Sequence, residues 1–420
     1  MTKNILTDLI QNPSCMDDYD PNAMSVMQAK KFIQQFLAPI IEVETLPIRD
    51  ALGRTLSKEI ISPCNVPNHN NSAMDGFAFK YEDVNKPLKV IGTAFAGKPF
   101  SGEILSGECI KIMTGAVIPA GADTVIMQER VEYSDHMLTI TEAPQAGANI
   151  RLAGEDLSLG QVVLSKGHTM RPADLGLIAS LGVAEVEVYR KLKVAFFSTG
   201  DELVGVGKPL EEGQIYDSNR YTLYGMLTRM GVEISDFGAI PDQVALLEKT
   251  LLDAASTHDV VITSGGVSVG EADHMKALLA KHGQVLFWKI NMKPGRPLAY
   301  GKVNNAHYFG LPGNPVATMV SFYQFVRDAL ITIMGAEVQP TPLFNVECTM
   351  PIKKAKGRTE FIRGSLFIDN NTWKVKPTGN QSSGVLSSMS KANCFIVLDE
   401  ETSSCDAGTQ VKVQVFEGII

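Results

Sequence analysis

The sequence predicts an α/β-plus-β protein of several domains, in which a central domain with a parallel sheet is accompanied by smaller β domains. Over residues 190–340, apolar runs alternate steadily with amphipathic helical stretches, which is the pattern of a parallel sheet wrapped by helices. Over residues 64–149 and 341–420, short apolar runs are separated by glycine and proline turns, as in small β domains. The length of 420 residues leaves room for two to four domains of roughly 100–200 residues each.

We expect four parts. Apolar residues at helical spacing predict helices over 25–40, with Ser25 as a possible N-cap, and over 48–60 and 170–182. These helices would form a linking domain that is interrupted by an inserted β domain, and the C-terminal strands would close into a barrel. The expected parts are a discontinuous N-terminal helical linking domain (20–63 and 150–189), a small β domain (64–149), the α/β domain (190–340) and a C-terminal β-barrel (341–420).

Composition and charge exclude several classes of protein. The formal net charge of -8 argues against a general nucleic-acid binder, which would usually be basic. Six cysteines lie far apart without a CxxC pair, which argues against a disulfide framework or a zinc site. The N-terminus does not resemble a signal peptide, and no run of about 18 apolar residues predicts a membrane span. We therefore expect a cytoplasmic protein that binds neither membranes nor nucleic acid.

Within the α/β domain, each strand leads into a loop and then a helix. The expected strands are 193–199, 233–240, 259–266 and 307–313, and the expected helices are 218–231, 242–256, 273–283 and 315–335. In an open parallel sheet, ligands bind where the carboxyl ends of the strands meet these loops. The small residues there expose backbone N–H groups to an anion. The expected substrate-binding residues of these loops are Ser198, Thr199, Gly200, Ser264, Gly265, Gly266, Ser268, Gly270, Pro312, Gly313 and Asn314.

Three of these loops also carry an acidic residue, namely Glu202, Asp242 and Asp273. Taken singly, each is equally well explained as a helix N-cap or first-turn residue. Taken together, three acids at one edge of a sheet would converge on one crevice. Carboxylates beside a phosphate loop are the usual ligands of Mg²⁺, which neutralises the phosphate. We therefore predict a Mg²⁺ site formed by these three acids.

Basic residues are expected to form one wall of the same site. The segment 287–301 contains Lys289, Lys293 and Arg296, and Pro294 and Pro297 stiffen its backbone. A solvated basic turn is the alternative. Placed before the last strand of the sheet, the segment favours anion binding.

Two further motifs remain open to more than one interpretation. In "LPGNPVAT" (311–318), Asn314 could cap the following helix, or the turn could present N–H groups to a ligand. The pair Asp75-Gly76 is typical of a hairpin turn. His69 has no partner at metal-ligand spacing.

No G-x-S-x-G, Walker A or G-x-G-x-x-G motif occurs, so the signatures of serine hydrolases, P-loop proteins and Rossmann oxidoreductases are missing.

Seven motifs occur in the order found in the MoeA family. They are "SAMDGFA", "IMTGA", "RxxGED", "STGDEL", "SGGVSVGEAD", "MKPGRP" and "LPGNPVAT". From about residue 20 to the C-terminus, the chain therefore resembles the molybdopterin molybdenumtransferases, which are related to the C-terminal part of gephyrin. The strand–helix region also resembles the stand-alone molybdopterin adenylyltransferases. Arg296 stands where lysine is expected in "MKPGKP", which keeps the charge but changes the geometry.

This resemblance implies that molybdate and adenylylated molybdopterin are the substrates, that AMP is released and that Mg²⁺ is required. It also implies a homodimer of four-domain subunits with an active site shared between them. The only other expected partner of this protein is a molybdopterin adenylyltransferase, which would bind it transiently. The resemblance supports Glu202, Asp242, Asp273, Lys289 and Lys293 as catalytic residues. It adds the catalytic residues Asp75, Thr114 and Asp156, and places Arg363 and Ser383 in the molybdate-binding part.

Two other functions remain to be compared with this one. An adenylyltransferase that uses ATP would need only the sheet domain, so the additional β domains argue against it. A non-catalytic scaffold like gephyrin would survive loss of the acids, whereas an enzyme would not. No long linker or partner-binding tail is visible in the sequence.

Overall fold

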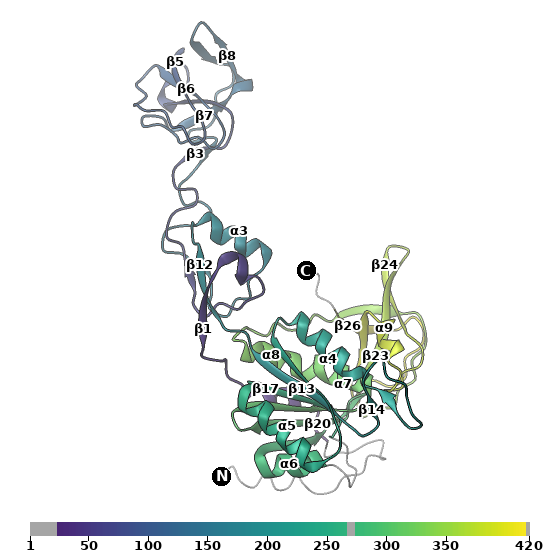
Figure 1. The fold of residues 1–420 in the computed structure, drawn as a ribbon. Helices are drawn as coiled ribbons and strands as arrows, with labels where there is room; N and C mark the ends of the chain where they lie inside the picture. Colours follow the sequence, from purple (N-terminus) through teal and green to yellow (C-terminus); the bar gives the residue numbers. More distant parts are fainter. Residues whose placement is uncertain (1–22, 267–273, 417–420) are drawn as a thin grey trace, which may run out of the picture. The chain divides into compact units, whose positions relative to one another are not determined.

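The computed structural model describes residues 23–266 and 274–416 (Figure 1). Contacts between residues divide the chain into two compact units. The first unit joins the chain up to Val43 with the chain from Tyr189 onward, and the second is Glu44–Val188. In the described part, no helix is long and apolar enough to cross a membrane.

The first unit is built on a six-stranded sheet with the strand order β16-β13-β17-β21-β20-β18. The first four strands are parallel, which confirms the predicted parallel sheet. Strand β20 is antiparallel to both of its neighbours, β21 and β18. Only Asn304 and Asn305 connect β20 to β21, and so short a turn can join only antiparallel strands. The strands are β13 (Lys193–Thr199), β16 (Glu233–Ile240), β17 (Val260–Ser264), β18 (Gly283–Lys289), β20 (Pro297–Val303) and β21 (Ala306–Leu311).

Helices cover both faces of this sheet (Figure 1). Along β13 the apolar side chains alternate: Val194 and Phe196 belong to one core, while Ala195 and Phe197 belong to the other. The first core contains residues of α2, α4, α7 and α8, and the second contains residues of α5 and α6. The helices are α2 (Val26–Gln34), α4 (Ser218–Arg229), α5 (Val244–Thr257), α6 (His274–His282), α7 (Pro315–Ser321) and α8 (Arg327–Ile333), with a π-helical segment (Phe322–Val326) joining the last two.

Helix α2 begins as predicted. The Ser25 side chain accepts a hydrogen bond from the backbone N–H of Gln28, and the Gln28 side chain accepts one from the backbone of Ser25. The helix ends at Gln34 rather than continuing to residue 40, ahead of Pro39, which disfavours a helical residue before it.

The C-terminal strands form a closed five-stranded barrel, as the sequence predicted. Strand β23 pairs with both β24 and β25, and this double pairing closes the ring β23-β24-β22-β26-β25. A short sixth strand, β19 (Met292–Lys293), extends this sheet through its pairing with β23, so the "MKPGRP" segment is attached to the barrel. The other elements are β22 (Phe344–Cys348), β23 (Thr359–Asp369), β24 (Thr372–Pro377), α9 (Ser387–Ser390), β25 (Cys394–Leu398) and β26 (Gln410–Val415), and a small pair of strands, β14 (Leu203–Val204) and β15 (Ile215–Tyr216), precedes α4.

The second unit contains the predicted β domain, a six-stranded sheet with the order β7-β4-β6-β5-β9-β8. The hairpin turn at Asp75-Gly76 is excluded, because Gly76 is the first residue of β4. A Cβ atom on Gly76 would lie 1.8 Å from the carbonyl oxygen of Ile126, so the close approach of β7 requires glycine here. These strands are β4 (Gly76–Phe79), β5 (Leu88–Ala94), β6 (Glu108–Ile112), β7 (Thr124–Met127), β8 (Val131–Ser134) and β9 (Met137–Ile140).

The rest of the second unit contains one predicted helix and lacks another. Helix α3 (Pro172–Ser180) lies where the sequence placed it, with proline in its first turn. The helix expected over 48–60 is wrong: only a 3-10 turn forms at Ile48–Ala51, and Thr55 and Leu56 instead form isolated β-bridges with Thr169 and Val188. Three two-stranded sheets complete the unit, formed by β1 (Val43–Pro47) with β12 (Glu185–Tyr189), β2 (Ile60–Ile61) with β11 (Val162–Leu164), and β3 (Asn71–Ser72) with β10 (Ile150–Arg151).

Candidate active site

The loop after β13 folds a carboxylate back over a glycine. Gly200 has a φ of 148°, and a Cβ atom at this position would lie 2.4 Å from a carboxylate oxygen of Glu202. A side chain at position 200 would therefore displace that carboxylate. Ser198 and Thr199, which precede the glycine, are buried.

Acidic residues gather around this loop. The backbone N–H of Asp242 donates a hydrogen bond of 2.9 Å to the Asp201 carboxylate, which joins the loops after β13 and β16. Partial desolvation and the charges of Asp201 and Glu202 raise the pKa of Asp242, while the charge of His274 lowers it. Like charges brought this close are unfavourable unless a cation neutralises them. The arrangement of Glu202 and Asp242 therefore suits a divalent cation.

Two of the three predicted metal ligands thus lie at the same edge of the sheet. The third, Asp273, lies outside the described residues, as do the predicted substrate-binding residues Ser268 and Gly270. Within residues 23–266 and 274–416, no three His, Cys, Asp or Glu side chains gather closely enough to hold a metal ion.

The glycine-rich loop after β17 packs closely against its neighbours. Gly265 and Gly266 both have positive φ values, 89° and 65°. A Cβ atom on Gly265 would lie 2.7 Å from the carbonyl oxygen of Thr199, and one on Gly313 would lie 3.9 Å from the Cα atom of Gly265. The loops after β13, β17 and β21 therefore meet largely through backbone atoms, with the Thr199 hydroxyl beside Gly265, an arrangement that suits phosphate binding.

The loop after β21 connects the sheet to the barrel. Asn314 precedes α7 but makes no capping hydrogen bond with its side chain, so the capping interpretation is wrong. The side-chain oxygen of Asn314 instead lies near Gly384 of the barrel, at 4.0 Å from where a Cβ atom of that residue would be. The backbone N–H of Val316 donates to the carbonyl oxygen of Ser383 at 3.1 Å. Ser383 of the barrel therefore lies beside the first turn of α7 and close to Pro312 and its loop.

Arg363 carries a positive charge into the contact between the barrel and the α/β domain, because it alternates with Ile362 of the barrel core and shares the face of Phe361, which belongs to the first core of the sheet. The residue is 1% exposed, and its Nε donates to Ser388 Oγ while its Nη2 donates to the Ser382 carbonyl, both at 3.0 Å. These partners are neutral, and burial lowers the pKa of Arg363 to about 10. A buried guanidinium with neutral partners favours a nearby oxyanion.

The basic "MKPGRP" segment lies next to the barrel. Lys293 is half-exposed, and its Nζ is 3.8 Å from the carboxylate of Glu360, its neighbour on β23. Lys289 and Arg296 flank the turn, which is closed by a backbone hydrogen bond of 2.7 Å from Ile290 to Arg296. Pro294 of this turn is buried and Pro297 opens strand β20. The structure therefore brings the predicted lysines to the junction of sheet domain and barrel.

Three predicted catalytic residues belong to the second unit. Asp75 and Thr114 come together: the backbone N–H and the hydroxyl of Thr114 donate to one oxygen of Asp75 at 2.7 and 2.8 Å. These hydrogen bonds lower the pKa of Asp75, and both residues are exposed. Asp156 is exposed in a separate loop, whose backbone bonds to Val66. The pairing of Asp75 with Thr114 agrees with a shared role.

Sequence reasoning missed three residues at the sheet edge. The first is Asp201, which precedes the predicted residue Glu202. Its carboxylate accepts a hydrogen bond from the backbone N–H of Asp242. Asp217 and Asn219, at the start of α4, are buried and bonded to strand-end residues. The motif "DSN" before a helix signals an N-cap, but nothing in the sequence reveals which strand ends its side chains reach.

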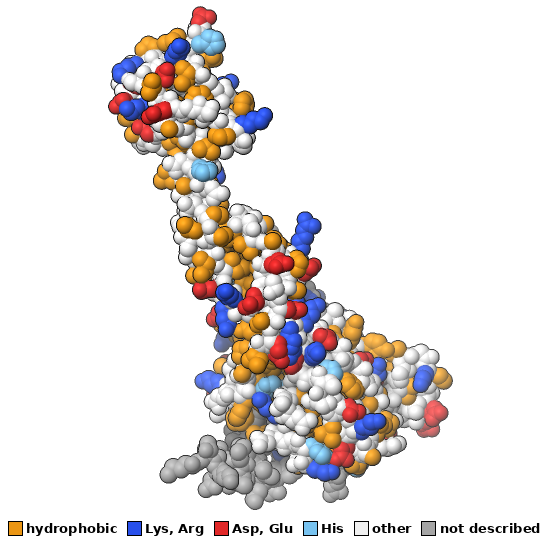
Figure 2. Space-filling view, turned by 60° about the vertical axis from the view of Figure 1, so that its left-hand side comes forward, with side chains coloured by type: hydrophobic (Ala, Val, Ile, Leu, Met, Phe, Trp, Pro, Cys, Tyr) orange, Lys and Arg blue, Asp and Glu red, His pale blue; other side chains and the backbone are white. Residues whose placement is uncertain are grey.

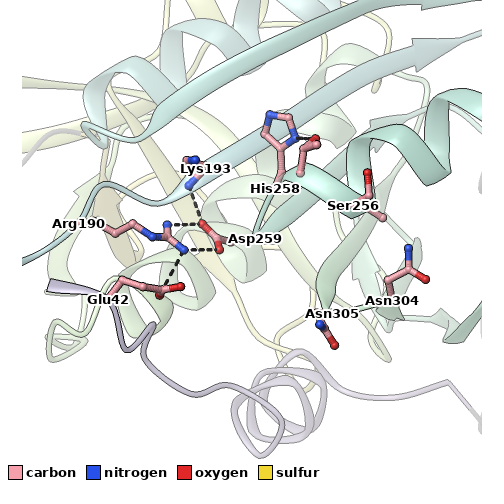
Figure 3. A pocket seen from close by; sticks show the side chains of 10 residues that line it. Glu42, Arg190, Lys193, Ser256, His258, Asp259, Asn304 and Asn305 are labelled. Carbon is pink, nitrogen blue, oxygen red and sulfur yellow. Dashed lines mark hydrogen bonds and ion pairs between the residues drawn. The ribbon is translucent and has the colours of Figure 1, made fainter.

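A pocket of about 360 Å³ lies at the opposite, amino end of the same strands (Figure 3). Arg190 donates to both oxygens of Asp259 at 2.7 and 2.8 Å and to Glu42 at 3.4 Å. The side chains of Glu42 and Asp259 thus both point at the guanidinium, and the backbone of Lys193 donates to Asp259 as well. Opposite charges balance here, in contrast to the carboxyl end.

Known proteins match the chain along almost all of its described length. Residues 24–182 match the MoeA N-terminal region (domain I and II), residues 195–332 a probable molybdopterin binding domain, and residues 345–416 the MoeA C-terminal region (domain IV). A molybdopterin molybdenumtransferase of Haemophilus influenzae is 47% identical over 93% of this chain and 98% of its own length. Gephyrin of Dictyostelium discoideum is 33% identical, over 88% of this chain and 59% of its own length.

Solved structures agree with these sequence matches. The crystal structure of a molybdopterin biosynthesis MoeA protein from Pyrococcus horikoshii OT3 superposes with a TM-score of 0.82, at 30% identity, over 94% of this chain and all of that one. The order of the three matched regions, the near-complete coverage of the bacterial relative and the agreement in fold all lead to one conclusion. This chain belongs to the MoeA family.

Proposed function

We propose that this protein inserts molybdenum from molybdate into adenylylated molybdopterin, with release of AMP, in a reaction that depends on Mg²⁺. Its family makes it an enzyme of molybdenum cofactor biosynthesis, of the molybdopterin molybdenumtransferase type. The observation that carries the finer proposal is the acidic edge of the sheet. There partial desolvation and the charges of Asp201 and Glu202 raise the pKa of Asp242 beside a glycine-lined edge.

The acids and the glycines would act on the phosphate groups of the substrate. Glu202 and Asp242 would hold the metal, together with Asp273, which lies outside the described residues. Mg²⁺, when bound, neutralises the phosphoanhydride and makes its phosphorus easier to attack. The backbone at Gly265 and Gly313 offers a surface without side chains, on which phosphate oxygens can approach N–H groups closely.

The basic residues at the barrel would act on molybdate. Lys293 is half-exposed at the junction, and the buried Arg363 lies on β23, the strand that pairs with Lys293. Oxyanions are bound by such charges where little water competes. We therefore place molybdate between the "MKPGRP" turn and the barrel loop that contains Ser383.

We also propose that the protein works as a homodimer whose partner completes the site. The Asp75 carboxylate accepts two hydrogen bonds from Thr114, which fix it in an exposed position on its β domain. Hydrophobic side chains reach the surface in both units (Figure 2), including Ile61 and its strand partner Val162 in the linking region. Such exposed apolar residues are typical of interfaces.

We place the reaction in the cytosol, because the described cysteines are free thiols, as expected in a reducing compartment.

The test of the function is a quenched assay with purified protein, adenylylated molybdopterin and Mg²⁺, in which AMP is measured with and without molybdate. We expect molybdate-dependent AMP release together with active cofactor. Pyrophosphate release from ATP and bare molybdopterin would instead identify an adenylyltransferase. Inactivity in both assays would contradict the enzymatic proposal and favour a scaffold.

The test of the shared site is subunit mixing. Asp75→Asn and Asp242→Asn are each expected to be inactive as homodimers. Random mixing of the two chains should restore about one quarter of the wild-type activity, because half of the dimers would contain one intact site out of two. No recovery in a mixture shown to exchange subunits would contradict a site shared between subunits.

A further inference from the structure

Two side chains at the start of helix α4 contact the carboxyl edge of the sheet. Asp217 precedes the helix, and its Oδ1 accepts a hydrogen bond of 3.2 Å from the backbone N–H of Arg220. The same oxygen accepts a bond of 3.1 Å from the hydroxyl of Ser198, at the carboxyl end of β13. An N-cap needs only the first of these bonds. The second ties the helix to the edge of the sheet.

Asn219, two residues further on, reaches the next two strands. Its side-chain Nδ2 donates to Ser264 Oγ at the end of β17 and to the carbonyl oxygen of Gly313 after β21, both at 2.7 Å. Asn219 is 8% exposed, so water competes little for these bonds. Both amide hydrogens are therefore used to hold two neighbouring loops at a fixed separation.

The three strands reached by Asp217 and Asn219 are adjacent in the sheet, in the order β13-β17-β21. Their loops meet with almost no side chains between them, since Gly265 lies against both Thr199 and Gly313. Two hydrogen bonds already join the loops after β17 and β21, one of 3.1 Å from the Gly265 backbone to Leu311 and one of 3.4 Å from Ser264 Oγ to the Pro312 carbonyl. The bonds from α4 add a constraint from outside the sheet, because the Asn219 side chain contacts both loops at once.

The same network is not optimised for stability alone. Asn219 Oδ1 is buried and has no hydrogen-bond partner within the described residues, and Asp217 Oδ2 has none either, although Arg220 Nη1 lies 3.9 Å from it. Buried acceptors without partners cost free energy, so a residue selected only for stability would be apolar. Polar groups that are retained despite this cost are found where geometry matters for function.

We propose that Asn219 is a positioning residue that fixes the spacing of the Ser264–Gly265 and Gly313 loops for the adenylylated substrate, with Asp217 fixing the loop of Ser198. Asn219 acts through these loops. This inference rests on the proposed function. Molybdate is held by other residues, at the barrel, and its binding does not depend on Asn219.

The test compares two substitutions that each turn a buried amide donor into a carboxylate. Asn219→Asp removes the donor to Gly313. The matched control, Gln324→Glu, alters a residue that is 4% exposed and bonds to Gln414 of the barrel at 3.1 Å, in the π-helical segment after α7. For both variants, AMP release is measured against adenylylated molybdopterin and against molybdate, and unfolding is followed by circular dichroism.

For Asn219→Asp we expect the KM for adenylylated molybdopterin to rise about tenfold or more, with a smaller loss of kcat and an unchanged KM for molybdate. For Gln324→Glu we expect a lower unfolding midpoint and unchanged KM values. An unchanged substrate KM in a folded Asn219→Asp variant would overturn the inference, and so would an equal rise for both substrates. If Asn219→Asp does not fold, Asn219→Ser, which adds no charge, is subject to the same criteria. Absence of AMP release from the wild-type protein would instead contradict the proposed function.

Discussion

At the amino end of the six-stranded sheet, Asp259 receives hydrogen bonds from Arg190 and from the backbone of Lys193, whereas at the carboxyl end Asp242 faces Asp201 and Glu202. Burial alone would raise the pKa of Asp259, but the bonds from Arg190 and Lys193 outweigh it, so that the pKa is lowered. At Asp242, desolvation and neighbouring acids act in the same direction, and the pKa is raised.

The difference shows how the same strands can serve two purposes. Charges that are paired within the protein hold the fold together and need nothing further. Charges of one sign that are brought together destabilise the fold and are tolerated where a ligand neutralises them. The pocket in Figure 3 lies at the paired end, so its size alone does not identify it as the reactive site.

The largest expected effect is at the carboxyl end. Glu202→Gln keeps the shape of the side chain but removes a charge from the proposed metal site. We expect AMP release to fall about 100-fold or more, because electrostatic groups at a reacting phosphate usually contribute that much. The matched control is Glu42→Gln at the amino end, which should retain wild-type activity. Equal activity of both variants in the AMP assay would remove the distinction between the two ends.

A second pair of variants compares lysines. Lys293→Met removes a half-exposed charge at the barrel junction, and Lys193→Met removes one that lines the pocket at the amino end. We expect the KM for molybdate to rise about tenfold for the first, because a hydrogen bond to a charged group contributes about 1.5–3 kcal/mol. Lys193→Met should leave this KM unchanged. If neither substitution changes the KM for molybdate, the anion binds elsewhere.

At the amino end the expected effect is on stability. Arg190→Met leaves Asp259 without its two-point partner and should lower the free energy of unfolding by about 2 kcal/mol, the usual value for charge-assisted hydrogen bonds. Urea unfolding of the variant and the wild type measures this loss. The kinetic constants at low temperature, where both proteins are folded, should not change. A stable variant with reduced activity would show that the paired end takes part in the reaction.

The smallest expected effect is on the pH dependence of the free energy of unfolding, to which Asp259 and Asp242 should contribute with opposite signs. Because the pKa of Asp259 is below its ordinary value of 3.8, its ionised form stabilises the fold above that value, and this stabilisation is lost as the pH falls through the lowered pKa. The pKa of Asp242 is above 3.8, so its ionised form costs stability at neutral pH, and the cost disappears as the pH falls. Unfolding midpoints of Asp259→Asn and Asp242→Asn, each relative to wild type, should therefore shift in opposite directions at neutral pH. The two shifts should both vanish in acid, and shifts of the same sign would contradict the charge states assigned to the two ends.

Sequence patterns predicted the strands of the sheet because buried parallel strands read as continuous apolar runs. "KVAFFST" corresponds to the buried strand β13 residue for residue, and "EISDFGAI" corresponds to β16, an edge strand in which only Ile240 is buried. The helix expected over 48–60 failed, because the chain at Thr55 and Leu56 pairs with residues more than 100 positions away. Pairing at such distance leaves no local signal. Strand β20 was also not predicted, although its pairing with β21 is local.

The sequence predicted which types of residue lie at the candidate site, but not which of their side chains contact one another. Acids and glycines after strands mark the carboxyl edge, and the structure places Glu202 and Asp242 there with Gly265 and Gly313. The sequence does not reveal that Asn219 reaches Gly313, 94 positions away. Nor does it distinguish the acid that bonds to the neighbouring loop, Asp201, from the one folded over Gly200. Such contacts depend on how loops converge in space.

The account is tested most directly by one comparison, the rate of molybdate-dependent AMP release for Asp242→Asn and Asp259→Asn. The two substitutions are chemically identical and lie at opposite ends of the same sheet. We predict that Asp242→Asn loses AMP release while its unfolding midpoint is equal to or above that of the wild type, and that Asp259→Asn keeps AMP release but unfolds earlier. Retained AMP release in a folded Asp242→Asn variant, or its specific loss in a folded Asp259→Asn variant, would contradict the assignment of the chemistry to the carboxyl end.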